Sequence, residues 1–330
     1  MSERERSENR VEWIDALRGV GIIFVVAGHV FSAPAAHHVI FLFHMPLFFF
    51  LSGFLFRPEP FRVLAKKRVR SLLIPYVAFL LLVTALDLVA FKFDNIHTLP
   101  LHPYSRFFGS LAFGGSLLTG SQGVAWFVPC LFLTTLAYAA AEQACGGPLK
   151  PATIAVVVAL YLLSFLLPAG PSPLGSGQVP QALAFFWAGR AAQPAAWPGR
   201  GWAVGLAVFL AAAAFVPAID MKYMQFGWPV VSALVALGAI AALTRAAQAL
   251  ASRQAINRAA SALGRAALVI MFLHLFFVVH LRHVAPEPLI FILGLLAPFL
   301  AYLLLSKFEA GRFIFLGKSG GIGPTLKKPD

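Results

Sequence analysis

Long apolar segments separated by short polar connections recur along the whole chain. Each holds about 18 or more mostly apolar residues, enough for one helix to cross the hydrocarbon core of a bilayer. The apolar positions run continuously and do not alternate with a period of two, so the pattern favours transmembrane helices over a membrane β-barrel. We expect ten spans, at residues 13–32, 37–56, 72–92, 123–141, 152–168, 180–197, 202–218, 226–244, 266–284 and 287–306. The sequence therefore predicts an all-α polytopic membrane protein.

The composition agrees with this pattern. Of 330 residues, 59% are hydrophobic and only 12% charged, and the mean hydropathy is +0.81, whereas about 45–50% apolar residues is usual for soluble domains. No polar linker divides the chain. We assign residues 1–12 to an N-terminal tail, 13–306 to one transmembrane domain and 307–330 to a C-terminal tail.

The C-terminal tail is basic and rich in glycine, so we expect little regular structure in it. Its "GKS" at 317–319 is not a phosphate-binding P-loop, because Arg312 stands where the first glycine is required and no strand precedes it.

The net charge of +13 reflects membrane topology. With both termini in the cytoplasm, nearly all lysines and arginines fall in cytoplasmic connections, as the positive-inside rule demands. The exceptions are Lys92, Arg106, Lys222 and Arg282 on the outer side, and Arg18 within the first span. We therefore expect ten helices with cytoplasmic termini and no nucleic-acid partner.

The first apolar segment, "WIDALRGVGIIFVVAGHV" (13–30), contains three ionisable residues. Arg18 and His29 lie eleven residues, or about three helical turns, apart on one face, a rise of about 16 Å. Asp15, three residues before Arg18, can pair with it. One interpretation is a structural ion pair and a hydrogen-bonded histidine. The other, which we favour, is a site, because ionisable groups inside spans usually mark one.

The second segment and the loop after it continue the pattern. "FHMPLFFFLSGFLF" (43–56) carries His44 and a Ser52-Gly53 pair at which another backbone can approach closely. "RPEPFRVLAKKRVRSLLIPY" (57–76) is strongly basic. Taken alone, this loop is either a topology signal or a binding site for anions.

Together with "WFVPCLF" (126–132), "FFWAGR" (185–190) and "ALGRAALVIMFLH" (262–274), these motifs resemble the acyltransferase family 3 membrane proteins, which O-acylate polysaccharides and other cell-surface glycans. The version here is most similar to the short ten-helix members, the fucose 4-O-acetylase-like and exopolysaccharide acetyltransferases. The resemblance implies an O-acetyltransferase of the bacterial inner (cytoplasmic) membrane that uses cytoplasmic acetyl-CoA as co-substrate.

The resemblance also implies roles for individual residues. The histidine matching His29 is catalytic in the family and the arginine matching Arg18 is essential. From its spacing, we expect Asp15 to orient Arg18. Lys67 and Arg70, with Arg68 between them, match the family's basic pair more loosely. These cations suit the phosphates of CoA, because guanidinium groups bind phosphate well.

Three further residues are candidates for binding the acceptor, a glycan or lipid-linked sugar. His44 and His274 are either site residues or hydrogen-bonded core histidines. Trp126 is either an interfacial anchor or a platform for stacking a sugar ring. We expect no metal site, since Cys130 and Cys145 have no metal-ligand spacing.

Two other functions are open to a polytopic membrane protein. An exporter of a polysaccharide or acylated glycan is the main alternative, but the two halves of the chain show no repeat with interrupted helices in matching positions. A membrane scaffold or sensor without chemistry leaves Arg18 and His29 unexplained.

Overall fold

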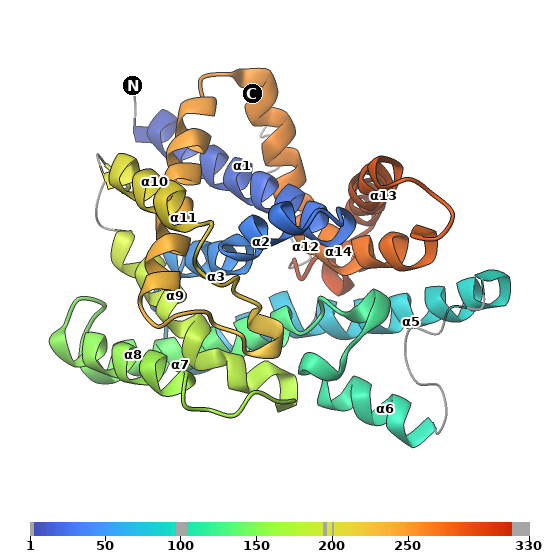
Figure 1. Ribbon diagram of the computed structural model, residues 1–330, viewed down its shortest axis with the longest axis horizontal. Helices are drawn as coiled ribbons and strands as arrows, with labels where there is room; N and C mark the ends of the chain where they lie inside the picture. The colour runs from blue at the N-terminus through green and yellow to red at the C-terminus, as the bar shows by residue number, and fades with distance from the viewer. Residues whose placement is uncertain (1–2, 95, 97–103, 194–196, 200, 319–330) are drawn as a thin grey trace, which may run out of the picture.

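The computed structural model describes residues 3–94, 96, 104–193, 197–199 and 201–318. Within these ranges the chain forms helices and no β-strand, apart from a single antiparallel bridge between Asp220 and Gln225. This confirms the predicted all-α class (Figure 1). The α-helices are α1 (Glu3–Val30), α2 (Pro34–Phe41), α3 (His44–Phe54), α4 (Phe61–Arg68), α5 (Ile74–Asp94), α6 (Tyr104–Phe113), α7 (Phe127–Cys145), α8 (Pro151–Ser164), α9 (Val179–Ala192), α10 (Gly201–Ala212), α11 (Val231–Leu250), α12 (Gln254–Leu281), α13 (Glu287–Lys307) and α14 (Glu309–Ile314).

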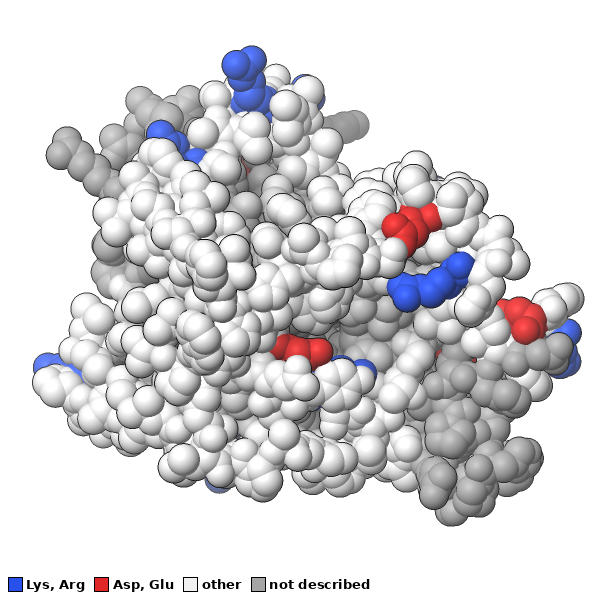
Figure 2. All heavy atoms as spheres, in the orientation of Figure 1, with Lys and Arg blue, Asp and Glu red and all other residues white. Residues whose placement is uncertain are grey.

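Seven helical segments among the described residues are long and apolar enough to cross a membrane. They are Glu12–Val30, Pro34–Phe54, Phe61–Asp94, Gly120–Cys145, Val231–Leu250, Gln254–Leu281 and Glu287–Lys307. Charged side chains are sparse on the face shown in Figure 2.

The other three predicted spans coincide with α8, α9 and α10, which are shorter than expected. α8 and α9 have 14 residues and α10 has 12, so they measure about 21 and 18 Å against a hydrocarbon core of about 30 Å. Hydropathy continues beyond the ends of α8 and α10, but Pro168 and Pro217 follow, and proline does not support a continuing helix. The count of ten spans and the cytoplasmic termini stay predictions.

The second predicted span is broken in its first half. α2 ends at Phe41 and α3 begins at His44, with Pro46 in its first turn. Proline is tolerated there because the first N–H groups of a helix lack partners within it. The break brings the aromatic ring of Phe41 against the His44 side chain, with ring centroids 4.5 Å apart.

Helix pairs pack closely where glycines face a neighbouring backbone. α1 and α12 lie side by side, and a β-carbon at Gly19 would overlap the carbonyl oxygen of Ala260, as one at Gly264 would overlap that of Asp15. α3 and α9 meet in the same way at Gly53 and Gly189. The close approach expected at Ser52-Gly53 is thus confirmed, and small residues let the backbones touch.

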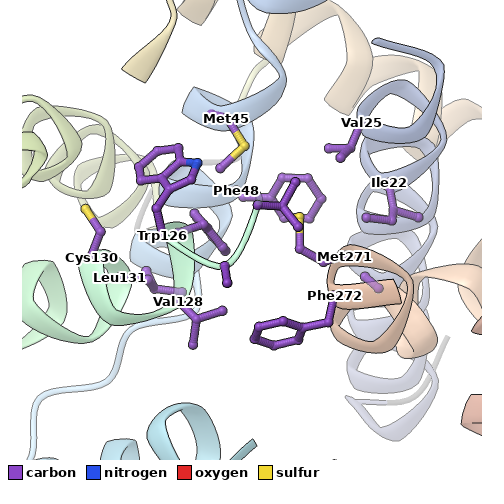
Figure 3. Close-up of a cluster of buried hydrophobic side chains, with 14 of the residues drawn as sticks. Ile22, Val25, Met45, Phe48, Trp126, Val128, Cys130, Leu131, Met271 and Phe272 are labelled. Atoms are coloured by element: carbon purple, nitrogen blue, oxygen red, sulfur yellow. The ribbon is translucent and has the colours of Figure 1, made fainter. Parts of the chain in front are cut away.

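The helices enclose a mainly apolar core. Figure 3 shows side chains from α1, α3, α7 and α12 pointing toward one another around Phe48 and Met271. Other members of this cluster are Ile22, Val25, Met45, Val128 and Phe272.

The C-terminal tail is more ordered than predicted. Residues 309–314 form α14, and the Arg312 guanidinium donates to the Ser306 carbonyl oxygen at 3.0 Å. Phe315 packs against the buried ring of Phe79 with centroids 5.1 Å apart. The expectation of little regular structure was wrong for 309–314, because apolar side chains interspersed with the basic ones find a place against the core. Residues 319–330 lie outside the described part. At the other end, α1 begins at Glu3, within the segment assigned to the N-terminal tail.

Candidate functional site

Two cavities lie along the packed pair α1 and α12. One, here the Arg18 cavity, has a volume of about 380 Å³ and is lined by Asp15, Arg18 and Arg265, among others. The other, here the His29 cavity, has a volume of about 270 Å³ and is lined by His29 and by residues of the helix ends and loops around it. Met271 of α12 lines both. The two cavities are therefore adjacent, with Arg18 at one and His29 at the other.

The Arg18 cavity is electropositive. Arg18 Nη1 donates to Asp15 Oδ1 at 3.2 Å, which confirms the predicted pair. The side chain of Arg18 is 37% exposed and that of Asp15 is 16% exposed, so the pair borders open space. Arg265 and Lys318 add two more cations. Because three positive groups share one carboxylate, the cavity suits an anionic ligand.

The predicted basic loop lies nearby but does not line this cavity. Lys67 is exposed, and its Nζ lies 2.8 Å from Glu59 Oε1. Arg68 and Arg70 are partly buried, and among the described residues their Nε atoms have no hydrogen-bond partner. Arg70 lies in a π-helical stretch (Val69–Leu73) between α4 and α5, a local irregularity frequent at functional sites.

The ring of His29 has a defined tautomer. Its Nδ1 lies 2.8 Å from the carbonyl oxygen of Val25. A carbonyl oxygen can only accept, so Nδ1 carries the hydrogen and Nε2 of the neutral ring keeps its lone pair. Nδ1 is bonded back to its own helix, and the ring lines the His29 cavity. Nε2 can therefore act as a base on a bound hydroxyl.

His44 and Trp126, two of the residues that the sequence marks as candidates for binding the acceptor, lie beside His29 in the structure. Both line the His29 cavity and both are largely buried, with 2% and 4% of their surface exposed. His44 Nδ1 donates to the Ile40 carbonyl oxygen at 3.0 Å. Phe41 and His37, whose rings stack with centroids 3.9 Å apart, complete an aromatic wall.

His274 lies behind His29 and is fully buried. The two rings meet edge to face with centroids 5.2 Å apart. Its Nδ1 contacts the Ile270 and Met271 carbonyl oxygens, each at 2.9 Å, and within the described part of the chain its Nε2 has no partner. His274 therefore contacts His29, and it does not line the cavity itself.

The C-terminal end of α1 is fixed by side chains from the segments around it. The Arg282 guanidinium donates to the carbonyl oxygen of His29 at 2.6 Å. The backbone N–H of Ser32 donates to Glu287 Oε1 at 3.0 Å. A cation at a helix C-terminus also interacts favourably with the helix dipole. These contacts fix the backbone that carries the His29 ring.

Sequence reasoning missed four charged residues of the two cavities: Asp220 and Lys222 in the His29 cavity, and Arg265 and Lys318 in the Arg18 cavity. The charge pattern marks Lys222, Arg265 and Lys318 only as topology signals, and Asp220 carries no signal of its own. Asp220, Lys222 and Lys318 lie outside the long helices, where no periodicity points to a site, whereas Arg265 lies inside α12. The signal available for Arg265 was its place in the motif at 262–274.

Lys222 has an altered acidity. Its Nζ donates to the carbonyl oxygen of Leu118 at 2.7 Å. Burial lowers its pKa to about 8, although the nearby Asp220 carboxylate opposes this shift. Burial also raises the pKa of Asp220 above its usual range. At neutral pH Lys222 is still mostly protonated, so it presents an ammonium group to the cavity that holds His29.

Two further features concern ligands. A third cavity, of about 590 Å³, lies between α10 and α11 and is also lined by residues of α1 and α2; it is almost wholly apolar and holds none of the predicted site residues. In the part of the chain that the structure describes, no group of three or more His, Cys, Asp or Glu side chains is placed to hold a metal ion.

Comparison with known proteins gives one match. A family model described as an acyltransferase domain matches residues 11–307. The searches of curated proteins and of solved structures found no match.

Proposed function

Because the chain belongs to acyltransferase family 3 and is a membrane acyltransferase, we propose that it moves an acetyl group from acetyl-CoA to a hydroxyl of a glycan or lipid-linked sugar. One observation carries this proposal. His29, with its Nε2 available, lines a cavity that adjoins a second cavity rich in cations. We further propose that the protein lies in the bacterial inner membrane with the Arg18 cavity toward the cytoplasm.

The Arg18 cavity is the proposed donor site. CoA carries several phosphate charges, and Arg18 and Arg265 offer guanidinium groups to them. Asp15 holds Arg18 in place through their ion pair. Arg68 and Arg70 lie just before α5 and do not line the cavity, but their Nε atoms are unpaired within the described residues, so they supply further donors to the part of CoA that extends beyond the cavity. Lys67, already paired with Glu59, contributes mainly to the local potential.

The pantetheine arm of CoA extends from the phosphates toward His29. Arg18 and His29 are about 16 Å apart along α1, so the thioester must pass the side chains between the two cavities. Met271 lines both cavities and has a flexible, unbranched side chain. We place the path of the arm along Met271.

The His29 cavity is the proposed acceptor site, and it is large enough for one sugar ring. Trp126 offers an aromatic face for stacking. Asp220 and Lys222 offer a hydrogen-bond acceptor and a donor to sugar hydroxyls. His44 presents its Nε2 to the same space, since its Nδ1 is bonded to Ile40.

His29 then acts as general base. Its Nε2 takes the proton of the attacking hydroxyl while the hydroxyl oxygen forms a bond to the thioester carbonyl carbon. The carbon–sulfur bond breaks, and the protonated imidazole returns the proton to the departing CoA sulfur. His274 contacts the His29 ring and Arg282 its backbone, so both serve as positioning residues.

The experiment is an assay of the purified protein in lipid nanodiscs with acetyl-CoA labelled in the acetyl group. We expect the label to appear on an added glycan acceptor, or as free acetate when water replaces the acceptor. A protein that moves glycan across vesicles and leaves acetyl-CoA intact would be an exporter, and the proposal would be rejected. The natural acceptor is identified by comparing the glycan of a deletion strain with the parent by mass and NMR.

A further inference from the structure

The end of the described chain returns to the Arg18 cavity. Lys318 lines this cavity beside Arg18 and Arg265, although it follows the last long helix. Its backbone N–H donates to the Arg312 carbonyl oxygen at 2.9 Å, which closes the turn after α14. Its Nζ lies 5.9 Å from the ring centroid of Tyr302. The lysine is thus held on a folded turn that brings its side chain to the cavity.

The segment Phe313–Lys318 packs against the π-helical stretch Val69–Leu73 that precedes α5. The Arg70 guanidinium lies 4.9 Å from the ring centroid of Phe313. Gly317 has a φ of +61°, and a β-carbon there would lie 2.6 Å from Ser71 Cα. Only glycine combines this backbone conformation with so close an approach. The backbone at Gly317 therefore packs directly against Ser71, and the next residue, Lys318, lines the cavity.

The charges of Arg265 and Lys318 are not balanced by the protein. Among the described residues neither side chain forms an ion pair with a carboxylate, and the one acidic residue lining the cavity, Asp15, pairs with Arg18. Cations that share a cavity repel one another, so their gathering there costs stability unless an anion joins them. The arrangement fits a ligand with more than one negative group.

We infer that Lys318 binds a phosphate of the acyl donor, and that Phe313–Lys318 forms one wall of the donor site. This inference rests on the proposed function, since it takes the Arg18 cavity as the place where the donor binds. It adds a residue outside residues 11–307, the part of the chain that the family model matches. It also assigns a role to α14: Phe313 of this helix contacts Arg70, and Arg312 accepts the hydrogen bond that closes the turn carrying Lys318.

The test is the affinity of the purified full chain in nanodiscs for CoA, measured by titration calorimetry. Lys318→Ala should raise the Kd by about tenfold or more, the scale expected when a hydrogen bond to a charged group is lost. Its binding should also depend less steeply on salt. Lys318→Arg, which keeps the charge, should stay within about threefold of the wild type, because either cation can contact phosphate. Gly317→Ala should reproduce the loss by displacing the turn.

Lys307→Ala is the matched control, because this exposed lysine at the end of α13 does not line the cavity. Wild-type affinity in a folded Lys318→Ala protein would overturn the inference and leave the proposed function standing. Equal weakening by Lys307→Ala and Lys318→Ala would also overturn it, since the effect would then be general electrostatics. If the wild type itself binds no CoA, the proposed donor site fails as well, and all variants will share that result.

Discussion

Replacing His29 with alanine should slow acetyl transfer by about 10²–10⁴-fold, the usual scale for losing a general base. The Kd for CoA should stay close to that of the wild type, because the Arg18 cavity lies about three helical turns away along α1. The rate is measured with saturating acetyl-CoA and acceptor, and the Kd by calorimetry. This separation of rate from donor affinity distinguishes a catalytic histidine from one that only stabilises the fold.

His283→Ala is the matched control for this variant. His283 is exposed and does not line the His29 cavity, so its removal should leave the rate unchanged. If a well-folded His29→Ala protein transfers acetyl at the wild-type rate, the catalytic role of this histidine is rejected.

Replacing Arg18 with alanine should instead weaken donor binding strongly and lower activity with it. Removing one member of a hydrogen-bonded charge pair costs about 2–5 kcal/mol, which corresponds to roughly 30-fold to several thousandfold in Kd. The variant also leaves the carboxylate of Asp15 without its partner, and this negative charge would repel the phosphates of CoA. The measurement is the Kd for CoA of the purified variant.

The double variant Asp15→Ala/Arg18→Ala separates these two effects. It removes the stranded carboxylate, so it should bind CoA better than Arg18→Ala alone, while remaining weaker than the wild type. An unchanged Kd in Arg18→Ala would show that the arginine has no part in donor binding. A double variant no better than the single one would show that Asp15 acts only through Arg18.

The features predicted correctly from the sequence depend on local geometry. Helical periodicity alone places Asp15 beside Arg18, and their ion pair is present in the structure. A glycine within an apolar helix indicates close backbone contact, and Gly53 makes one. The motifs also identified the family correctly, because several motifs agreed in order and spacing.

The features that were missed depend on tertiary packing. Lys222 and Lys318 reach their cavities through irregular turns, and no periodic pattern shows where a turn will lie. Hydropathy also continued past the true ends of α8 and α10, because it measures transfer to lipid and not backbone conformation. The order in the C-terminal tail comes from Phe315 packing on Phe79, a contact between segments far apart in sequence.

The proposed function accounts for the division of the site residues along α1, with Arg18 midway along the helix and His29 at its C-terminal end. Under the proposed function the donor is highly charged and the acceptor is a polar sugar, so we propose that each enters from its own aqueous side and that only the pantetheine arm passes between the helices. Only the uncharged pantetheine arm then enters the low-dielectric interior, and burying it costs far less free energy than burying a phosphate.

The most direct test is acetyl transfer across a sealed bilayer. The protein is reconstituted into vesicles that enclose the acceptor glycan, and labelled acetyl-CoA is added outside. Arg62→Cys and Ser176→Cys, made separately in a background without Cys130 and Cys145, report orientation through an impermeant thiol reagent, because both positions are exposed. We predict label on the enclosed glycan in vesicles where position 62 faces the acetyl-CoA and position 176 faces the lumen. Label confined to glycan added on the same side as acetyl-CoA would contradict the account.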